Sequence, residues 1–251
     1  MTRPARNADG PPPLVITCEH GGERVPRRYT AQFARHRALI RGHRGHDLGA
    51  LKIARALARR FRAPLEYSTT SRLVIDPNRS LHHRDLFSEV TRGLPAADRQ
   101  WIIDHHWRPF RERVAAHVAA KIETHGVVCH LSVHTFVPVM DGRTRRTDIG
   151  LLYDPSRPGE RALADRWRAA LHAQRPDLTL HRNAPYRGVA DGHTTALRRV
   201  FPAQRYIGIE LEVNQRFASL PSHKWHALIE ALATSFAAAR QAVAVPALNT
   251  R

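Results

Sequence analysis

The chain has 251 residues, and its 40 lysines and arginines outnumber its 22 aspartates and glutamates, for a formal net charge of +18. This length is enough for one large α/β domain or two small ones, with a substantial core, and no apolar run is long enough to span a bilayer. The basic residues are nearly all arginines spread along the chain, without a basic tail, an aromatic RNA-binding signature or finger-like Cys and His spacing. The charge alone therefore does not indicate a nucleic-acid-binding protein.

The segment before the first apolar run, residues 1–13, is polar and proline-rich and lacks the apolar core of a signal peptide. We therefore expect a disordered leader, a single domain over residues 14–245, and a cytoplasmic protein that does not bind membranes. The two cysteines, Cys18 and Cys129, both lie in apolar runs, which favours buried reduced thiols over a disulfide framework.

Strands and helices alternate along the sequence. Short β-branched and aliphatic runs predict strands at residues 14–18, 73–75, 127–133, 149–153 and 206–213. Apolar residues at helical spacing predict helices at residues 50–61, 98–124, 159–173 and 225–244. This alternation, with no internal repeat, is typical of an α/β layered fold.

The first predicted strand leads into His20, which enters a Gly-Gly turn and is followed three residues later by Glu23. A histidine and a carboxylate at this spacing on a turn can bind the same zinc ion. Alone the motif is a weak signal, because Glu23 can equally cap the next helix. Its interpretation depends on the polar residues elsewhere in the chain.

Polar side chains follow other predicted strands at the points where those strands end. Asn78 and Arg79 come after the second strand, with Asp76 expected to orient their turn, and His134 comes directly after the third. In open α/β sheets the ligand crevice lies beyond the carboxyl ends of the strands. These side chains are therefore expected to gather at one edge of the sheet.

The last predicted strand carries two glutamates. Its residues alternate strictly, so Glu210 and Glu212 point to one face while aliphatic side chains point to the other. In a strand that is otherwise so apolar, the two glutamates are expected to line a site. With the elements above they complete what a zinc hydrolase needs: three ligands for the metal, a free glutamate that moves the water proton, and an Asn-Arg pair for a substrate carboxylate.

Seven motifs occur in the order found in the N-formylglutamate amidohydrolase family, one of the zinc carboxypeptidase and aspartoacylase-like hydrolases. They are CEHGGERVP (18–26), GHDLGA (45–50), DPNRS (76–80), LSVHTF (131–136), DIGLLYD (148–154), NAPYRG (183–188) and EVNQ (212–215). The chain resembles this family over residues 14–237. The resemblance implies a three-layer, phosphorylase/hydrolase-like α/β fold, in which helices cover both faces of a mixed sheet as in zinc carboxypeptidases.

The resemblance also implies one divalent metal ion, zinc, with His20 and His134 as two of its ligands. Glu23 is the carboxylate ligand expected by analogy with the carboxypeptidase pattern. Asp47, in the GHDLGA motif, is the acidic alternative. A supporting or substrate-binding role for His46 and for His193 stays open.

The residues that act on the substrate follow from the same resemblance. The general base is Glu212 or Glu210, with Glu212 favoured, and the substrate carboxylates are expected to bind Arg72, Asn78, Arg79 and Arg187. The implied function is removal of a formyl or other acyl group from a small anionic N-acylated acidic amino acid, with N-formylglutamate as the leading candidate. A zinc hydrolase of other N-acyl amino acids or small peptides is the alternative, and a non-catalytic basic protein that binds nucleic acid is a distant one.

Overall fold

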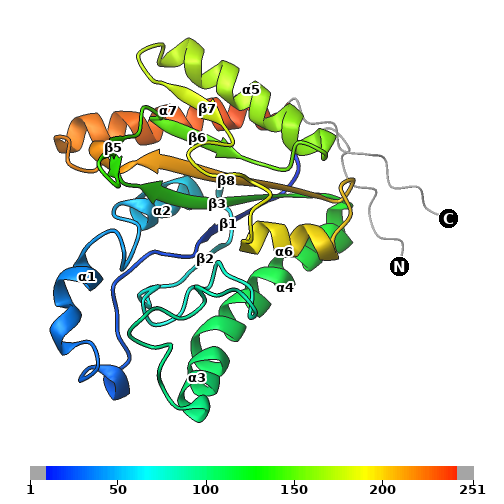
Figure 1. Ribbon diagram of the computed structural model, residues 1–251. Coiled ribbons are helices and arrows are strands. Elements are labelled where there is room, and N and C mark those ends of the chain that lie inside the picture. The colour runs from blue at the N-terminus through cyan, green and yellow to red at the C-terminus, as the bar shows by residue number, and fades with distance from the viewer. Residues whose placement is uncertain (1–9, 242–251) are drawn as a thin grey trace.

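The structure is a computed structural model that describes residues 10–241 (Figure 1). Residues 1–9 of the predicted leader lie outside the described residues. So do residues 242–245, the last residues of the predicted domain, which include the end of the helix predicted at residues 225–244. Within residues 10–241, no helix is both long enough and apolar enough to cross a membrane.

A six-stranded mixed sheet forms the centre of the fold. Its strands, in spatial order, are β2 (Leu65–Tyr67), β1 (Leu14–Cys18), β3 (Val128–Phe136), β8 (Tyr206–Asn214), β6 (Ile149–Leu152) and β7 (Leu180–Arg182). The first four are parallel, β6 runs antiparallel to β8, and β7 is parallel to β6. The predicted α/β fold with a mixed sheet is confirmed, although β2 and β7, which have three residues each, were not predicted.

Helices cover both faces of the sheet, as predicted (Figure 1). The helices α2 (Ala50–Phe61), α5 (Pro158–Gln174) and α7 (Ser222–Gln241) pack on one face, whereas α4 (Arg108–His125) and α6 (His193–Val200) pack on the other. The remaining named elements are α1 (Arg37–Arg41), α3 (Ala96–Ile102) and a hairpin of β4 (Val139–Met140) and β5 (Arg143–Thr144).

The face under α2, α5 and α7 holds the main hydrophobic core. Successive strand residues point to opposite sides, so every second side chain of a strand enters this core. From β3 and β8 these are Cys129, Leu131, Val133, Ile207, Ile209, Leu211 and Val213. The aliphatic face predicted for the last strand is thereby confirmed.

The opposite face is apolar only near the amino ends of its strands. There Val15, Val128 and Tyr206 pack against α4 and α6. Further along the same strands, this face carries buried polar side chains, among them Thr17, His130, Ser132, His134, Glu210 and Glu212. The sheet therefore presents a polar, buried surface beside the carboxyl ends of its parallel strands.

The prediction of a strand at residues 73–75 is wrong. Leu73, Val74 and Ile75 are buried, but Leu73 and Val74 lie in a turn and Ile75 has no regular secondary structure. Their side chains pack in a separate cluster beneath the loops, and the Thr91 hydroxyl donates to the carbonyl oxygens of Leu73 and Val74. These carbonyl groups are satisfied locally, so the apolar run reflects burial under a loop and not pairing in a sheet.

The helix predicted at residues 98–124 is irregular. It consists of α3, a π-helical turn at Ile103–Trp107 and α4. The indole Nε1 of Trp107 donates to the carbonyl oxygen of Arg79 at 2.9 Å. This turn therefore fastens the helix to the segment that carries the Asn-Arg pair.

Candidate metal centre and catalytic pocket

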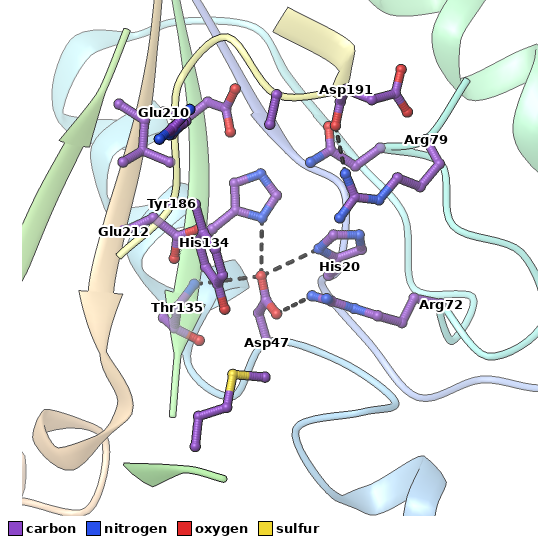
Figure 2. A pocket seen from close by; sticks show the side chains of 15 residues that line it. His20, Asp47, Arg72, Arg79, His134, Thr135, Tyr186, Asp191, Glu210 and Glu212 are labelled. Carbon is purple, nitrogen blue, oxygen red and sulfur yellow. Dashed lines mark hydrogen bonds and ion pairs between the residues drawn. The ribbon is translucent and has the colours of Figure 1, made fainter. Parts of the chain in front are cut away.

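Three buried side chains meet at the carboxyl ends of the parallel strands (Figure 2). His20 follows β1, His134 lies near the end of β3, and Asp47 precedes α2. The backbone nitrogen of Asp47 donates to the carbonyl oxygen of His20 at 2.9 Å, which holds the carboxylate beside the first strand. The chain then turns into α2 at Gly49, whose φ of 86° is a left-handed conformation that glycine adopts without strain.

The imidazole rings of His20 and His134 both direct Nδ1 toward one carboxylate oxygen of Asp47. Asp47 Oδ2 lies 3.3 Å from His20 Nδ1 and 3.0 Å from His134 Nδ1. Potential ligand atoms of the three residues all lie within 4.8 Å of one another. Two imidazoles and one carboxylate are a donor set that fits zinc and leaves a fourth position open.

The other nitrogen of each ring meets a further buried carboxylate. His20 Nε2 is 2.7 Å from Asp76 Oδ1, and His134 Nε2 is 3.3 Å from Glu19 Oε2. Histidines that bind metals almost always have such a partner, because it fixes the tautomer and the orientation of the ring. The surroundings of both histidines therefore also fit a metal centre.

The carboxylates around His20 are held in the ionised form that binds metals. Burial alone raises the pKa of Asp47, but the Arg72 guanidinium, which forms an ion pair with it, and the imidazoles of His20 and His134 hold that pKa well below its usual range. Burial also opposes ionisation of Asp76, yet its contact with His20 outweighs burial and the pKa is lowered.

Glu23, the ligand expected by analogy, lies outside this group. Its side chain is exposed, and the cluster of potential ligands found among residues 10–241 contains Asp47 but not Glu23. The backbone nitrogen of Arg24 donates to the carbonyl oxygen of Thr69 at 2.9 Å, so the chain here runs along the segment that follows β2. Of the two carboxylates considered from the sequence, only Asp47 is placed to share a metal ion with His20.

The two glutamates of β8 point into one pocket, as their alternation predicts, but their surroundings differ (Figure 2). Glu210 Oε1 accepts a hydrogen bond from the Thr194 hydroxyl in α6. Glu212 lies opposite His134 in the paired strand, and its buried Oε2 has no hydrogen-bond partner among the described residues. Burial raises the pKa of Glu212 to about 8, a shift that His134 opposes and Asp47 reinforces. Glu212 is therefore the carboxyl group available to a ligand in the pocket.

The pocket has a volume of about 320 Å³ and is lined by the three potential metal ligands, both glutamates and three arginines. Arg72 forms an ion pair with Asp47, and Arg79 Nη1 donates to the carbonyl oxygen of Asp191 at 2.6 Å. Arg187 lines the same pocket with an exposed side chain, and its guanidinium makes no hydrogen bond or ion pair with the described part of the chain. Among the predicted arginines, Arg187 thus has its charge available to a ligand.

Asn78 lines the pocket but is also tied to the fold. Its Oδ1 accepts a hydrogen bond from the backbone nitrogen of His193, the first residue of α6, at 2.7 Å. Its own backbone nitrogen donates to Asp76 Oδ1 at 2.8 Å. Asp76 therefore orients this turn, as expected from the sequence, and contacts His20 with the same oxygen.

Glu19 lies beside the candidate metal centre, although no role was predicted for it from the CEHGGERVP motif that contains it. It is wholly buried, with Oε1 accepting from the Thr17 hydroxyl at 2.8 Å and Oε2 accepting from the Ser132 hydroxyl at 2.7 Å. Besides His134, it contacts His193, whose Nδ1 lies 3.4 Å from Oε1. The signal was the alternation of the first strand, which places Glu19 on the same face as Thr17.

Known proteins resemble this chain in sequence and in fold. The family model described as N-formylglutamate amidohydrolase matches residues 12–218. Among solved structures, a gene product from Agrobacterium tumefaciens is 27% identical, with a TM-score of 0.74 over 92% of each chain. An N-formylglutamate amidohydrolase from Ralstonia eutropha JMP134 shares the fold, with a TM-score of 0.71 and 19% identity over 94% of each chain. A search of curated proteins gave no match.

Proposed function

The chain belongs to the N-formylglutamate amidohydrolase family, and from this premise we propose that it is a metal-dependent amidohydrolase that removes the formyl group of an N-formylated acidic amino acid, with N-formylglutamate as the leading substrate. The observation that carries the proposal is the unpaired, buried carboxyl oxygen of Glu212, in the pocket that also holds the His20, Asp47 and His134 side chains. A general base beside a metal-binding group is the arrangement that supports attack of water on an amide.

His20, Asp47 and His134 would hold the metal ion, and zinc best fits their donor atoms. When bound, such an ion supplies a Lewis acid that polarises a carbonyl group and lowers the pKa of water. Asp76 and Glu19 contact the two rings from behind, so the ligands are oriented before any substrate binds.

Glu212 acts as the general base in this proposal. Its carboxylate takes a proton from the attacking water, and the carboxylic acid so formed gives a proton to the amine nitrogen as the C–N bond breaks. Burial raises the pKa of Glu212 toward the working pH, the range in which a group can both take up and release a proton. Glu210 instead accepts a hydrogen bond from the Thr194 hydroxyl and thereby links β8 to α6.

Arg187 is the residue that we expect to bind a carboxylate of the substrate. Its guanidinium can form two parallel hydrogen bonds with a carboxylate, and no described side chain competes for it. Arg72 forms an ion pair with Asp47, and Arg79 donates to the backbone carbonyl oxygen of Asp191, so Arg187 is left to bind the substrate. Its positive charge favours an anionic amino acid derivative over a neutral one.

Release of formate from N-formylglutamate tests this proposal. The zinc-loaded protein is expected to release formate, to lose that activity when a chelator removes the metal, and to regain it when zinc is restored. N-formylleucine, which lacks the side-chain carboxylate, is expected to be a poorer substrate. No formate release by the zinc-loaded protein, or full activity of the metal-free protein, contradicts the proposal.

A further inference from the structure

The turn formed by residues 76–80 lies against the candidate metal centre. None of these residues belongs to a helix or a strand. Asp76 Oδ1 is 2.7 Å from His20 Nε2 and also accepts a hydrogen bond from the backbone nitrogen of Asn78 at 2.8 Å. Because the carboxylate is bonded within its own turn, a displacement of the turn also displaces the group that orients the His20 ring.

The same turn supports the wall of the pocket that carries Arg187. Arg79 Nη1 donates to the carbonyl oxygen of Asp191 at 2.6 Å (Figure 2), and the backbone nitrogen of Ser80 donates to Asp191 Oδ2 at 2.9 Å. Asp191 directly follows Ala190, whose backbone nitrogen donates to the carbonyl oxygen of Arg187 at 3.0 Å. The turn therefore links the place of Arg187 to that of the metal centre.

Two side chains hold this turn on the side of α4. Trp107 Nε1 donates to the carbonyl oxygen of Arg79 at 2.9 Å. Arg111 Nη1 donates to the carbonyl oxygen of Pro77 at 3.1 Å and to that of Arg79 at 3.4 Å. The Arg111 guanidinium also lies over the Trp107 ring, 4.7 Å from its centre, a cation–π contact that fixes the two side chains against each other. Together they form what we call the Trp107–Arg111 pair.

The π-helical turn at Ile103–Trp107 brings the pair to this place. Its hydrogen bonds join residues five apart, as in the bond from the backbone nitrogen of Arg108 to the carbonyl oxygen of Ile103. In a regular α-helix, residues five apart point about 140° away from each other. Here Ile102 and Trp107, five apart, both pack in the apolar cluster beneath the loops. The irregular turn therefore lets the helix bury Ile102 and still present Trp107 to the same loops.

Arg111 also brings a positive charge to the back of the site. Burial lowers the pKa of Arg111, and three carboxylates oppose that shift, those of Glu19, Asp191 and Asp76. Two of them, Glu19 and Asp76, contact the histidines of the metal centre. The described residues that line the catalytic pocket include neither Trp107 nor Arg111. The pair can therefore act on a ligand only through the residues that it holds.

We propose that Trp107 and Arg111 are positioning residues, which act through residues 76–80 to hold His20 and Arg187 in a fixed relation to each other. Without their hydrogen bonds the turn has more freedom, so the His20 ring and the Arg187 guanidinium are less well oriented. The role assigned to Arg187 rests on the proposed amidohydrolase function, whereas the effect on His20 can be measured without any reaction.

Zinc affinity is the first measurement. Arg111→Met and Trp107→Phe each remove the hydrogen bonds to the turn and keep most of the side-chain volume. Each is expected to weaken zinc binding by about two- to tenfold, the range that the loss of one or two hydrogen bonds gives. Competition with a chelator measures this affinity, and the visible spectrum of the cobalt-loaded protein is expected to change in both variants because it reports the geometry of the ligands.

The KM for N-formylglutamate at saturating zinc is the second measurement. Both variants are expected to raise it by about two- to tenfold. Glu212 is held by β8 and not by the turn, so kcat is expected to change less than KM. Arg111→Lys keeps the charge and can donate to one carbonyl oxygen, so it is expected to retain more of the zinc affinity than Arg111→Met. Trp107→Phe and Arg111→Lys carry the test if Arg111→Met fails to fold.

Arg113→Met and Trp101→Phe are the matched controls. Arg113 lies on α4 with an exposed side chain, 2.9 Å from Glu66 Oε2, and Trp101 packs against the same apolar cluster as Trp107. Both controls are expected to keep the zinc affinity and the KM of the wild type, although Trp101→Phe removes as much of an indole ring as Trp107→Phe does.

The outcomes separate this proposal from the proposed function. If either the zinc affinity or the KM of the folded Trp107 and Arg111 variants equals that of the wild type, or if the controls show the same losses, the positioning role is overturned. Formate release by the wild type then still supports the amidohydrolase function. If zinc affinity falls in both variants and in neither control while the wild type releases no formate, the pair positions His20 but the proposed reaction is wrong.

Discussion

The two faces of the central sheet differ although the same strands build both. In β3, Leu131 and Val133 point into the apolar core under α2, α5 and α7, while Ser132 and His134 point to the opposite face. Both sets are buried, so the difference does not come from exposure to solvent. It follows that alternation along a strand lets one face supply stability while the other carries the polar groups of the site.

The polar face is stable because nearly every group on it is paired. Burying a polar group is costly unless it forms a hydrogen bond. Thr17 contacts both Glu19 and His130, and His130 in turn contacts the Tyr206 hydroxyl at 2.6 Å. The unpaired Oε2 of Glu212 departs from this pattern, and a group left unpaired in a satisfied network is a good candidate for chemistry.

The largest effect is expected for Glu212→Gln. The amide cannot accept the water proton, so kcat for N-formylglutamate is expected to fall by about 10²–10⁴-fold. The free energy of unfolding is expected to change little, because Gln has the same shape as Glu and Oε2 makes no hydrogen bond that the substitution would break. Formate release and urea denaturation measure the two quantities.

Glu210→Gln is the matched control for this prediction, since both glutamates lie on the same face of β8. Glu210 accepts a hydrogen bond from Thr194 and so has a structural role. A smaller loss of kcat than for Glu212→Gln is therefore expected. If Glu210→Gln abolishes activity while Glu212→Gln keeps it, the two roles have been assigned in reverse.

Leu211→Ala tests the other face, one residue away along β8. Leu211 is wholly buried in the main core, so its truncation is expected to lower the free energy of unfolding by about 2–5 kcal/mol. The activity per folded molecule is expected to stay near that of the wild type. Urea denaturation and kcat at a temperature well below the melting point measure this.

Val200→Ala, which truncates an exposed aliphatic side chain in α6, is the control for Leu211→Ala and is expected to change stability by less than about 0.5 kcal/mol. A folded Leu211→Ala protein with normal stability and low activity contradicts the view that one face of the sheet supplies stability and the other carries the site.

Much of this fold was predictable because alternation and helical spacing are local signals. The strands at residues 14–18 and 206–213 and the helix at residues 50–61 lie where the pattern predicts them. The apolar run at residues 73–75 was wrongly predicted as a strand. Three apolar residues in a row indicate burial, but they do not indicate whether a sheet or a loop buries them. Pairing in a sheet depends on distant segments, and such a short run carries no information about them.

In the site, the sequence named the histidines but left each choice between carboxylates open. Asp47 and Glu23 are both acidic residues near a glycine turn. They differ in the path of the backbone, which places Asp47 beside His20 and carries Glu23 away from it. Glu210 and Glu212 share a face, and their difference comes from Thr194, a contact with another element. Residue type and spacing indicate the candidates for each role, whereas tertiary contacts distinguish between them.

The smallest effect concerns the pH dependence of stability on the polar face. Burial lowers the pKa of His130 to about 3, and its ring is neutral between Thr17 and Tyr206. In the unfolded chain a histidine takes up its proton near pH 6.5. The unfolded state therefore binds more protons between pH 6.5 and 3, so the stability that His130 contributes is complete above pH 6.5 and is lost as the pH falls.

Urea denaturation at pH 7 and pH 5 measures this contribution. Between these values the free energy of unfolding of the wild type is expected to fall by about 2 kcal/mol more than that of His130→Gln, which lacks the titrating ring. His82→Gln, which removes an exposed histidine, is the control and is expected to follow the wild type. Parallel pH profiles for the wild type and His130→Gln would mean that His130 is not kept neutral by the fold. The polar face would then tolerate a buried charge that its hydrogen bonds give no reason to expect.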